Sequence, residues 1–155
     1  MGVYAFGMRI SSDQEAMALA LAAAERALWL SNPNPRVGCI LTTPDGEVLG
    51  QGHTQVVGQA HAEIMALRDA AARGQNVQGA TAWVTLEPCA HHGRTGPCCD
   101  ALAAAGIGRV VAALTDPNPQ VAGQGMARLA AACVQTHILD AQDDIAVQAR
   151  ELNIG

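Results

Sequence analysis

Several features that whole classes of protein require are absent from this sequence. The chain has no lysine, which excludes Schiff-base catalysis and the phosphate-binding P-loop, and none of its three serines lies in a nucleophile-elbow pattern. It has no apolar run of about 18 residues, the length that a membrane span needs. The first residues do not form a secretory signal either. We therefore expect a cytoplasmic protein with no membrane partner.

Positive charge and aromatic residues are also scarce. The formal net charge is −5, all nine basic residues are arginines, and only 3% of the residues are aromatic. Nucleic-acid binding favours a basic stripe and a platform of aromatic rings, and the scattered arginines provide neither. We expect a small-molecule substrate and no nucleic-acid partner.

Disulfide bonds are not expected, because the five cysteines are an odd number and no secretory context accompanies them. Metal binding or burial is the better interpretation of these thiols. Cys39 and Cys133 lie in apolar runs, and we expect both to be buried as small hydrophobic side chains.

The 155 residues, half of them hydrophobic, suffice for one domain with a core. Residues 1–12 are expected to be an N-terminal arm, loose as far as Ile10, and residues 13–155 the folded domain. Ser12 and Glu15 form a capping box at the start of the first helix.

Hydrophobic periodicity and turn residues together predict an alternation of helices and strands. We predict helices over 13–29, 61–73, 98–105, 123–132 and 143–153, strands over 37–41, 48–53, 82–86, 109–114 and 135–139, and a loop over 87–97. This order indicates an α/β fold with a mixed five-stranded sheet, parallel in its second half, and helices on both faces.

A cluster of histidine, glutamate and cysteine runs from His61 to Cys99. His61 and Glu63 form a His-x-Glu triplet, Cys89 follows a proline, and Cys98 comes after eight intervening residues. In zinc-dependent nucleobase deaminases this pattern supplies the metal ligands and a glutamate that carries protons. One imidazole and two thiolates, from His61, Cys89 and one of the two adjacent cysteines, would leave a fourth zinc position for water. Spacing alone does not choose between Cys98 and Cys99.

Glu63 is the candidate proton carrier. It lies two residues after His61 in the first turn of a predicted helix, where it can face the open metal position without easily becoming a ligand. Zinc makes water acidic enough to ionise near pH 7, and a neighbouring carboxylate can pass the proton to a leaving amine. The pattern therefore indicates hydrolytic deamination.

Two alternatives to a catalytic metal site stay open at this level. A His-x-Glu triplet is common on solvated helix turns, and cysteines in a core of small residues often only pack. A structural zinc site normally shows four ligands with short Cys-x-x-Cys pairs, whereas eight residues separate Cys89 from Cys98. A catalytic site is favoured over both.

Six segments of the chain resemble one family: residues 32–38, 61–63, 85–89, 91–95, 97–102 and 116–125. Together they are similar to the deaminase domain of the riboflavin-biosynthesis bifunctional deaminase/reductase, and the likeness covers roughly residues 13–153. The HHGRT and DPNPQVAG sequences distinguish this family from cytidine, guanine and tRNA-adenosine deaminases, which share only the zinc-site residues.

The resemblance implies a three-layer α/β/α cytidine-deaminase-like fold and a bound Zn²⁺. It implies hydrolytic removal of the 2-amino group from 2,5-diamino-6-(5-phosphoribosylamino)pyrimidin-4(3H)-one, with release of ammonia. It assigns His61, Cys89 and Cys98, rather than Cys99, as zinc ligands and Glu63 as the catalytic residue. The substrate contacts that it implies are Asn34, His53 and His91, and, at the ribose phosphate, Arg94, Asp116 and Asn118.

The chain departs from the family pattern at Cys133, which stands where a glycine usually closes a helix. A larger departure is its length, because family members normally continue into a nicotinamide-dependent reductase domain. The chain contains no dinucleotide-binding motif. We expect a deaminase domain that works with a fused or separate reductase domain, and a homo-oligomer.

Two other functions are weighed against this one. The first is a different zinc nucleobase deaminase, of the guanine or tRNA-adenosine type. The second is a non-catalytic zinc-binding module.

Overall fold

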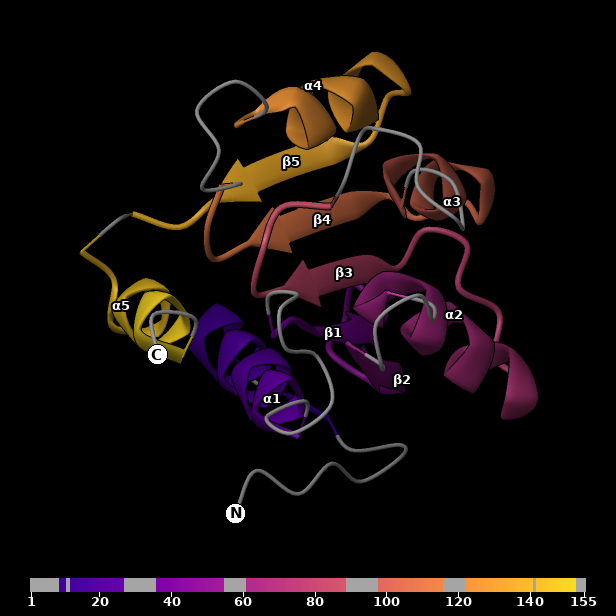
Figure 1. The fold of residues 1–155 in the computed structure, drawn as a ribbon. Coiled ribbons are helices and arrows are strands. Elements are labelled where there is room, and N and C mark those ends of the chain that lie inside the picture. Colours follow the sequence, from indigo (N-terminus) through magenta and orange to yellow (C-terminus); the bar gives the residue numbers. More distant parts are fainter. Residues whose placement is uncertain are drawn as a thin grey trace.

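The computed structural model of the chain describes residues 9–10, 12–26, 36–54, 61–88, 98–115, 122–140 and 142–152. Helices and strands alternate along it as the sequence predicts (Figure 1). The elements are α1 (Asp13–Glu25), β1 (Gly38–Thr42), β2 (Val48–His53), α2 (Ala62–Ala72), β3 (Thr81–Val84), α3 (Cys98–Ala104), β4 (Arg109–Ala112), α4 (Gln124–Ala131), β5 (Gln135–Ile138) and α5 (Asp144–Leu152). Among the described helices, none is long and apolar enough to cross a membrane.

The five strands form one mixed sheet in the order β2-β1-β3-β4-β5. β1 pairs antiparallel with both β2 and β3, whereas β3, β4 and β5 are parallel. The parallel half needs crossover connections, which α3 and α4 provide. The prediction of a mixed five-stranded sheet, parallel in its second half, is confirmed.

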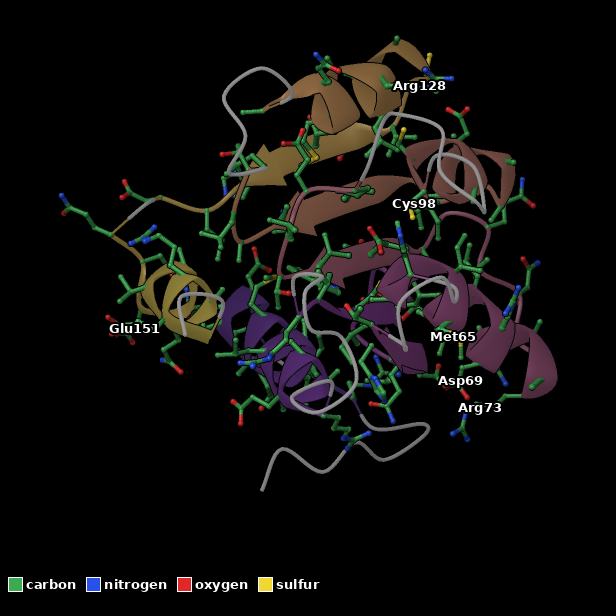
Figure 2. The ribbon with its side chains drawn as sticks, viewed as in Figure 1. Met65, Asp69, Arg73, Cys98, Arg128 and Glu151 are labelled. Carbon is green, nitrogen blue, oxygen red and sulfur yellow. The ribbon has the colours of Figure 1, made fainter. Side chains whose placement is uncertain are left out.

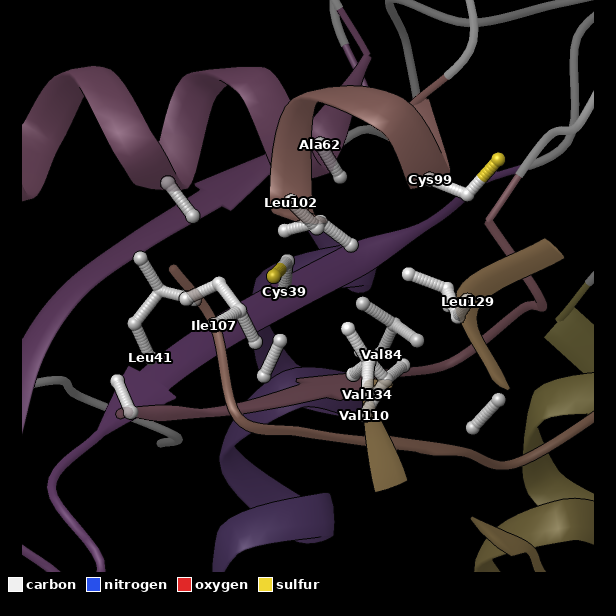
Figure 3. Packing of buried hydrophobic residues seen from close by; sticks show 14 of the residues in the cluster. Cys39, Leu41, Ala62, Val84, Cys99, Leu102, Ile107, Val110, Leu129 and Val134 are labelled. Carbon is white, nitrogen blue, oxygen red and sulfur yellow. The ribbon is translucent and has the colours of Figure 1, made fainter. Parts of the chain in front are cut away.

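Helices cover both faces of this sheet and give three layers (Figure 1). Successive strand residues face opposite layers, so each strand contributes to two cores. The core beneath α2, α3 and α4 includes Cys39, Leu41, Val84, Leu102, Val110 and Leu129 (Figure 3). The core beneath α1 and α5 includes Met17, Ile40, Trp83, Val111 and Ile145. The expected three-layer α/β/α fold is confirmed.

Of the residues expected to form the N-terminal arm, the structure describes 9–10 and 12, and these contact the folded domain. The Ser12 side chain accepts a hydrogen bond from the Glu15 N–H at 3.1 Å, so this half of the predicted capping box forms. Just before it, Arg9 forms a β-bridge with Glu47. Ile10 is buried, and its N–H donates to the carbonyl of Gly46 at 2.8 Å. Residues 9–10 therefore dock on the turn between β1 and β2.

β3 ends at Val84, two residues earlier than the sequence predicts. Thr85 still pairs with the start of β1: its N–H donates to the carbonyl of Gly38, and its hydroxyl accepts a hydrogen bond from the Gly38 N–H, each at 3.1 Å. β4 likewise ends at Ala112, and the carbonyl of Leu114 accepts from the Glu87 N–H at 2.8 Å. These bonds direct the chain that leads toward Cys89.

The expectation that Cys133 is buried is wrong, because its side chain is exposed. Cys133 follows α4 in the left-handed conformation, with φ 67°. Its N–H donates to the carbonyl of Ala130, and the N–H of Val134 donates to the carbonyl of Leu129, each at 3.0 Å. This is a Schellman motif, in which the buried apolar residue is Val134 rather than Cys133.

Replacing Cys133 with glycine should stabilise the fold, because a left-handed conformation is strained for a residue that carries a Cβ atom. We expect the free energy of unfolding to rise by about 1 kcal/mol. The matched control is Ala132→Gly, at a neighbouring residue with φ −91°, which should lose stability instead. Urea unfolding at a constant slope measures both changes. Equal destabilisation by the two substitutions would contradict the Schellman assignment.

Candidate functional site

His61 and Cys98 meet where α2 and α3 begin. The His61 Nδ1 atom lies 3.1 Å from the Cys98 Sγ atom, although 37 residues separate the two in sequence. His61 is the N-cap of α2, and its side chain makes no capping hydrogen bond to the helix. Cys98 is the first residue of α3, and Figure 2 shows it between that helix and α2. Two of the three predicted metal ligands therefore face each other.

This pair fits a zinc ion. Imidazole nitrogen and thiolate sulfur are the donors that zinc prefers, at about 2.0 Å and 2.3 Å from the metal. Tetrahedral geometry at those bond lengths places the two donor atoms about 3.5 Å apart. The observed 3.1 Å is a few tenths of an ångström shorter, so a small rotation of either side chain opens a metal position between them.

Small residues hold the first turn of α2 against β2. A Cβ atom on Gly52 would overlap backbone atoms of Ala62 and Ala66, so the strand and the helix approach this closely because residue 52 is glycine. Ala62 and Ala66 are themselves fully buried. Because Ala62 lies between His61 and Glu63, this packing fixes the backbone from which both candidate functional side chains extend.

Glu63 lies on the buried side of α2 and is 4% exposed. Its carboxylate lies close enough to the thiol of Cys39, which is fully buried on β1, to act on it electrostatically. Burial first, and the Glu63 carboxylate second, raise the pKa of the Cys39 thiol well above its usual value. Cys39 is therefore a neutral thiol at pH 7, as expected for a core residue.

The structure separates the two adjacent cysteines of α3. Cys98 faces His61, whereas the Sγ atom of Cys99 lies 3.9 Å from an oxygen of Asp100. Asp100 in turn receives two hydrogen bonds from Arg128 of α4, at 2.6 and 2.8 Å. Geometry thus supports Cys98 as the residue of this pair that meets a metal.

Glu87 has a role that the sequence analysis missed. It lies in the predicted loop before Cys89 but is 5% exposed, and its carboxylate accepts hydrogen bonds from backbone N–H groups of Gly123 and Met126. A sequence signal for this contact existed. The predicted helix over 123–132 begins Gly-Gln-Gly and has no serine, threonine, aspartate or asparagine to cap it.

His53, the predicted substrate contact at the end of β2, is half-buried. Its Nδ1 atom lies 3.1 Å from the carbonyl oxygen of Thr54. His53 also lines a cavity of about 370 Å³ together with Arg26, Gln51, Gly52, Met65, Arg68 and Asp69.

The remaining predicted site residues lie outside the described residues. Among the described ones, no group of three histidine, cysteine or acidic side chains is placed to hold a metal ion. The third predicted ligand, Cys89, is among the residues not described. The predicted substrate contacts that also lie outside the described residues are Asn34, His91, Arg94, Asp116 and Asn118.

Comparison with known proteins places these residues in a family context. The family model for the cytidine and deoxycytidylate deaminase zinc-binding region matches residues 10–114. The riboflavin biosynthesis protein RibD of Escherichia coli is 57% identical over 117 residues, which are 76% of this chain and 31% of that protein. The chain thus spans about a third of the length of the curated relatives it matches.

Two solved structures share the fold along almost the whole chain. Acinetobacter baumannii RibD superposes with a TM-score of 0.82 at 45% identity, covering 92% of this chain and 38% of that one. A Thermotoga maritima diaminohydroxyphosphoribosylaminopyrimidine deaminase/5-amino-6-(5-phosphoribosylamino)uracil reductase gives 0.80 at 35% identity, covering 90% of this chain and 38% of that one.

The two adjacent cysteines allow a sharp test of the ligand set. Cys98→Ala removes the sulfur that faces His61, and we expect the purified protein to lose most of its zinc. Cys99→Ala, its matched control, should keep the zinc content of the wild type. Elemental analysis of the purified variants measures both. Loss of zinc from Cys99→Ala with retention in Cys98→Ala would reverse the assignment.

Proposed function

Because the chain belongs to the cytidine and deoxycytidylate deaminase zinc-binding family, we propose that it hydrolyses an aminopyrimidine in riboflavin biosynthesis. The proposed substrate is 2,5-diamino-6-(5-phosphoribosylamino)pyrimidin-4(3H)-one, and the products are 5-amino-6-(5-phosphoribosylamino)uracil and ammonia. The observation that carries the proposal is the approach of His61 to Cys98 beside a buried glutamate on the same helix turn as His61.

In this proposal His61, Cys98 and Cys89 hold the zinc ion. Zinc, when bound, supplies Lewis-acid activation of water at neutral pH. Three protein ligands rather than four keep one position open for that chemistry.

Glu63 moves the protons. Hydrolytic deamination forms a carbon–oxygen bond, breaks the carbon–nitrogen bond of the amino group, and delivers a proton to the departing nitrogen. A single carboxylate can accept the proton of the attacking water and return it to the amine. Glu63 suits this role because it lies two residues after His61 and is 4% exposed, so bulk water does not compete for its proton.

The ribose phosphate of the substrate is assigned to Arg94, Asp116 and Asn118. A guanidinium grips phosphate oxygens with two parallel hydrogen bonds, and this chain has no lysine to serve instead. On the pyrimidine side the proposed contacts are Asn34, His53 and His91.

The alternatives fit the chain less well. A tRNA-adenosine deaminase must bind a polyanion, and a net charge of −5 without lysine opposes that partner. A non-catalytic zinc module gives no reason to bury an acid beside the metal ligands, because a buried carboxylate costs free energy.

We further propose a cytoplasmic homo-oligomer that acts with a reductase domain, fused or separate. The Thermotoga maritima relative is described as both a deaminase and a reductase, and this chain covers 38% of it. The deaminase domain proposed for residues 13–155 supplies the first of those two reactions.

Ammonia release under steady-state conditions tests the proposed reaction. The zinc-loaded protein should deaminate the phosphoribosylated diaminopyrimidine far faster than guanine, cytidine or adenosine. A preference for any of the last three would overturn the proposed substrate. No activity on any of the four by the zinc-loaded protein would favour the non-catalytic module.

Glu63→Gln should abolish proton transfer and leave the metal in place. Glutamine has the same size as glutamate but is not a base, so we expect a rate loss of at least ~10²-fold. Zinc content should stay that of the wild type. Glu47→Gln, on the connection between β1 and β2, is the control and should keep full activity. If Glu63→Gln retains its rate, another group carries the proton.

Arg94→Ala should weaken binding of the phosphorylated substrate specifically. Losing charge-assisted hydrogen bonds to phosphate should raise its KM by about tenfold or more. The dephosphorylated substrate should be affected little. Arg73→Ala, which removes an arginine paired with Asp69 on α2, is the control and should change neither KM. Equal effects of Arg94→Ala on both substrates would remove Arg94 from the phosphate site.

A further inference from the structure

α4 begins on the chain segment that leads into the proposed ligand Cys89. Oε1 of Glu87 accepts a hydrogen bond from the Gly123 N–H at 2.8 Å, and Oε2 accepts one from the Met126 N–H at 3.1 Å. One carboxylate thus binds the first turn of a helix that lies 36 residues or more further along the chain.

The start of α4 needs a hydrogen-bond acceptor from another part of the chain. The N-cap of α4 is Gly123, in the left-handed conformation with φ 85°, and it has no side chain with which to cap the helix. The first N–H groups of a helix have no partner within the helix, and together they carry partial positive charge. The Glu87 carboxylate meets both needs, and the two bonds in turn stabilise a charge that is 5% exposed.

The same segment touches α4 through its backbone. A Cβ atom on Gly125 would overlap the carbonyl oxygen of Pro88, so glycine is required for α4 to lie this close. On the other side, the Glu87 N–H donates to the carbonyl of Leu114 at 2.8 Å. Residues 87–88 are therefore held from both sides, by α4 and by the end of β4.

α4 also contacts the helix that starts with Cys98. Arg128 donates two hydrogen bonds to Asp100 of α3, and Leu129 packs with Leu102 in the core beneath the two helices (Figure 3). The Arg128–Asp100 pair is about half exposed on both side chains and contributes little by itself. The Glu87 side chain, by contrast, is buried where it bonds the start of α4.

We propose that Glu87 is a positioning residue of the metal centre, which fixes the backbone before Cys89 by binding the start of α4. The proposal rests on the proposed zinc site. It also gives α4 a role at the metal site, although α4 lies beyond residues 10–114, the part that the family model matches. Without the two hydrogen bonds, part of the free energy of zinc binding would have to offset the cost of ordering residues 87–88. Zinc should therefore bind more weakly.

Glu87→Gln tests the proposal with the size of the side chain kept. Its amide nitrogen would face one of the two N–H donors, so one hydrogen bond is lost and two donors oppose each other. We expect the zinc dissociation constant, measured by competition with a chromophoric chelator on the intact chain, to rise at least about tenfold. The d–d and thiolate charge-transfer bands of the cobalt-substituted protein should change as well, because the ligand geometry loosens.

Asp143→Asn is the matched control. The Asp143 carboxylate also bonds a helix start, accepting from the Ile145 N–H at 2.9 Å and from the Gln14 side chain at 2.8 Å. It should lose some stability and keep the zinc affinity and cobalt spectrum of the wild type. If Glu87→Gln behaves like Asp143→Asn in both readouts, Glu87 is only a helix cap and the proposal is wrong.

A second variant covers the case in which Glu87→Gln does not fold. Gly125→Ala pushes α4 away from Pro88 and changes no charge, and it should also weaken zinc binding and alter the cobalt spectrum. Wild-type affinity in Gly125→Ala would then overturn the proposal. If neither variant folds, excess zinc should restore folding by mass action, and failure to do so counts against a role at the metal.

Zinc binding by the wild-type chain distinguishes a failure of this proposal from a failure of the proposed function. A wild-type chain that binds no zinc would contradict the zinc site itself. A wild type that binds zinc tightly, with Glu87→Gln unchanged, would contradict only the positioning role.

Discussion

The approach of one imidazole nitrogen to one sulfur, between the starts of two helices, is the contact on which the proposed function depends. His61 and Cys98 lie at the starts of helices on the same face of the sheet, and their donor atoms are of the types that one zinc ion binds. The packing explains how they meet. α2 lies tightly on β2 through glycine and alanine, and α3 is the crossover from β3 to β4. The 3.1 Å contact of His61 with Cys98 shows that the two helix starts lie side by side.

The low aromatic content of the chain is related to this close packing of helices on the sheet. Helices that present alanine to glycine-containing strands can approach more closely than helices that present large side chains, and a close approach leaves little freedom in the helix starts. A metal site gains from that rigidity because its ligands must hold their positions before the ion arrives. The largest buried side chains, including Met17, Ile40 and Leu129, belong to the two cores on either side of the sheet.

The sequence predicted the parts of this arrangement that depend on local pattern. Periodicity predicted every described helix and strand within a few residues. The proximity of His61 and Cys98 could also be anticipated, because zinc sites need particular residue types, whereas the proposed roles of His61, Glu63 and Cys98 stay predictions. The predictions from sequence were wrong where the environment of a residue is not set by its neighbours in sequence. Glu87 looked like a loop residue because its partners, Gly123 and Met126, are distant in sequence. Cys133 looked buried because its neighbours are apolar, whereas a left-handed helix end turns it outward.

We propose that the starts of α2 and α3 hold one zinc ion through mixed nitrogen and sulfur donors. Zinc K-edge X-ray absorption of the purified wild-type protein measures that donor set directly. We expect one zinc per chain with a nitrogen at about 2.0 Å, two sulfurs at about 2.3 Å and one further light atom. A shell of four sulfurs, or of nitrogen and oxygen donors without sulfur, would contradict it.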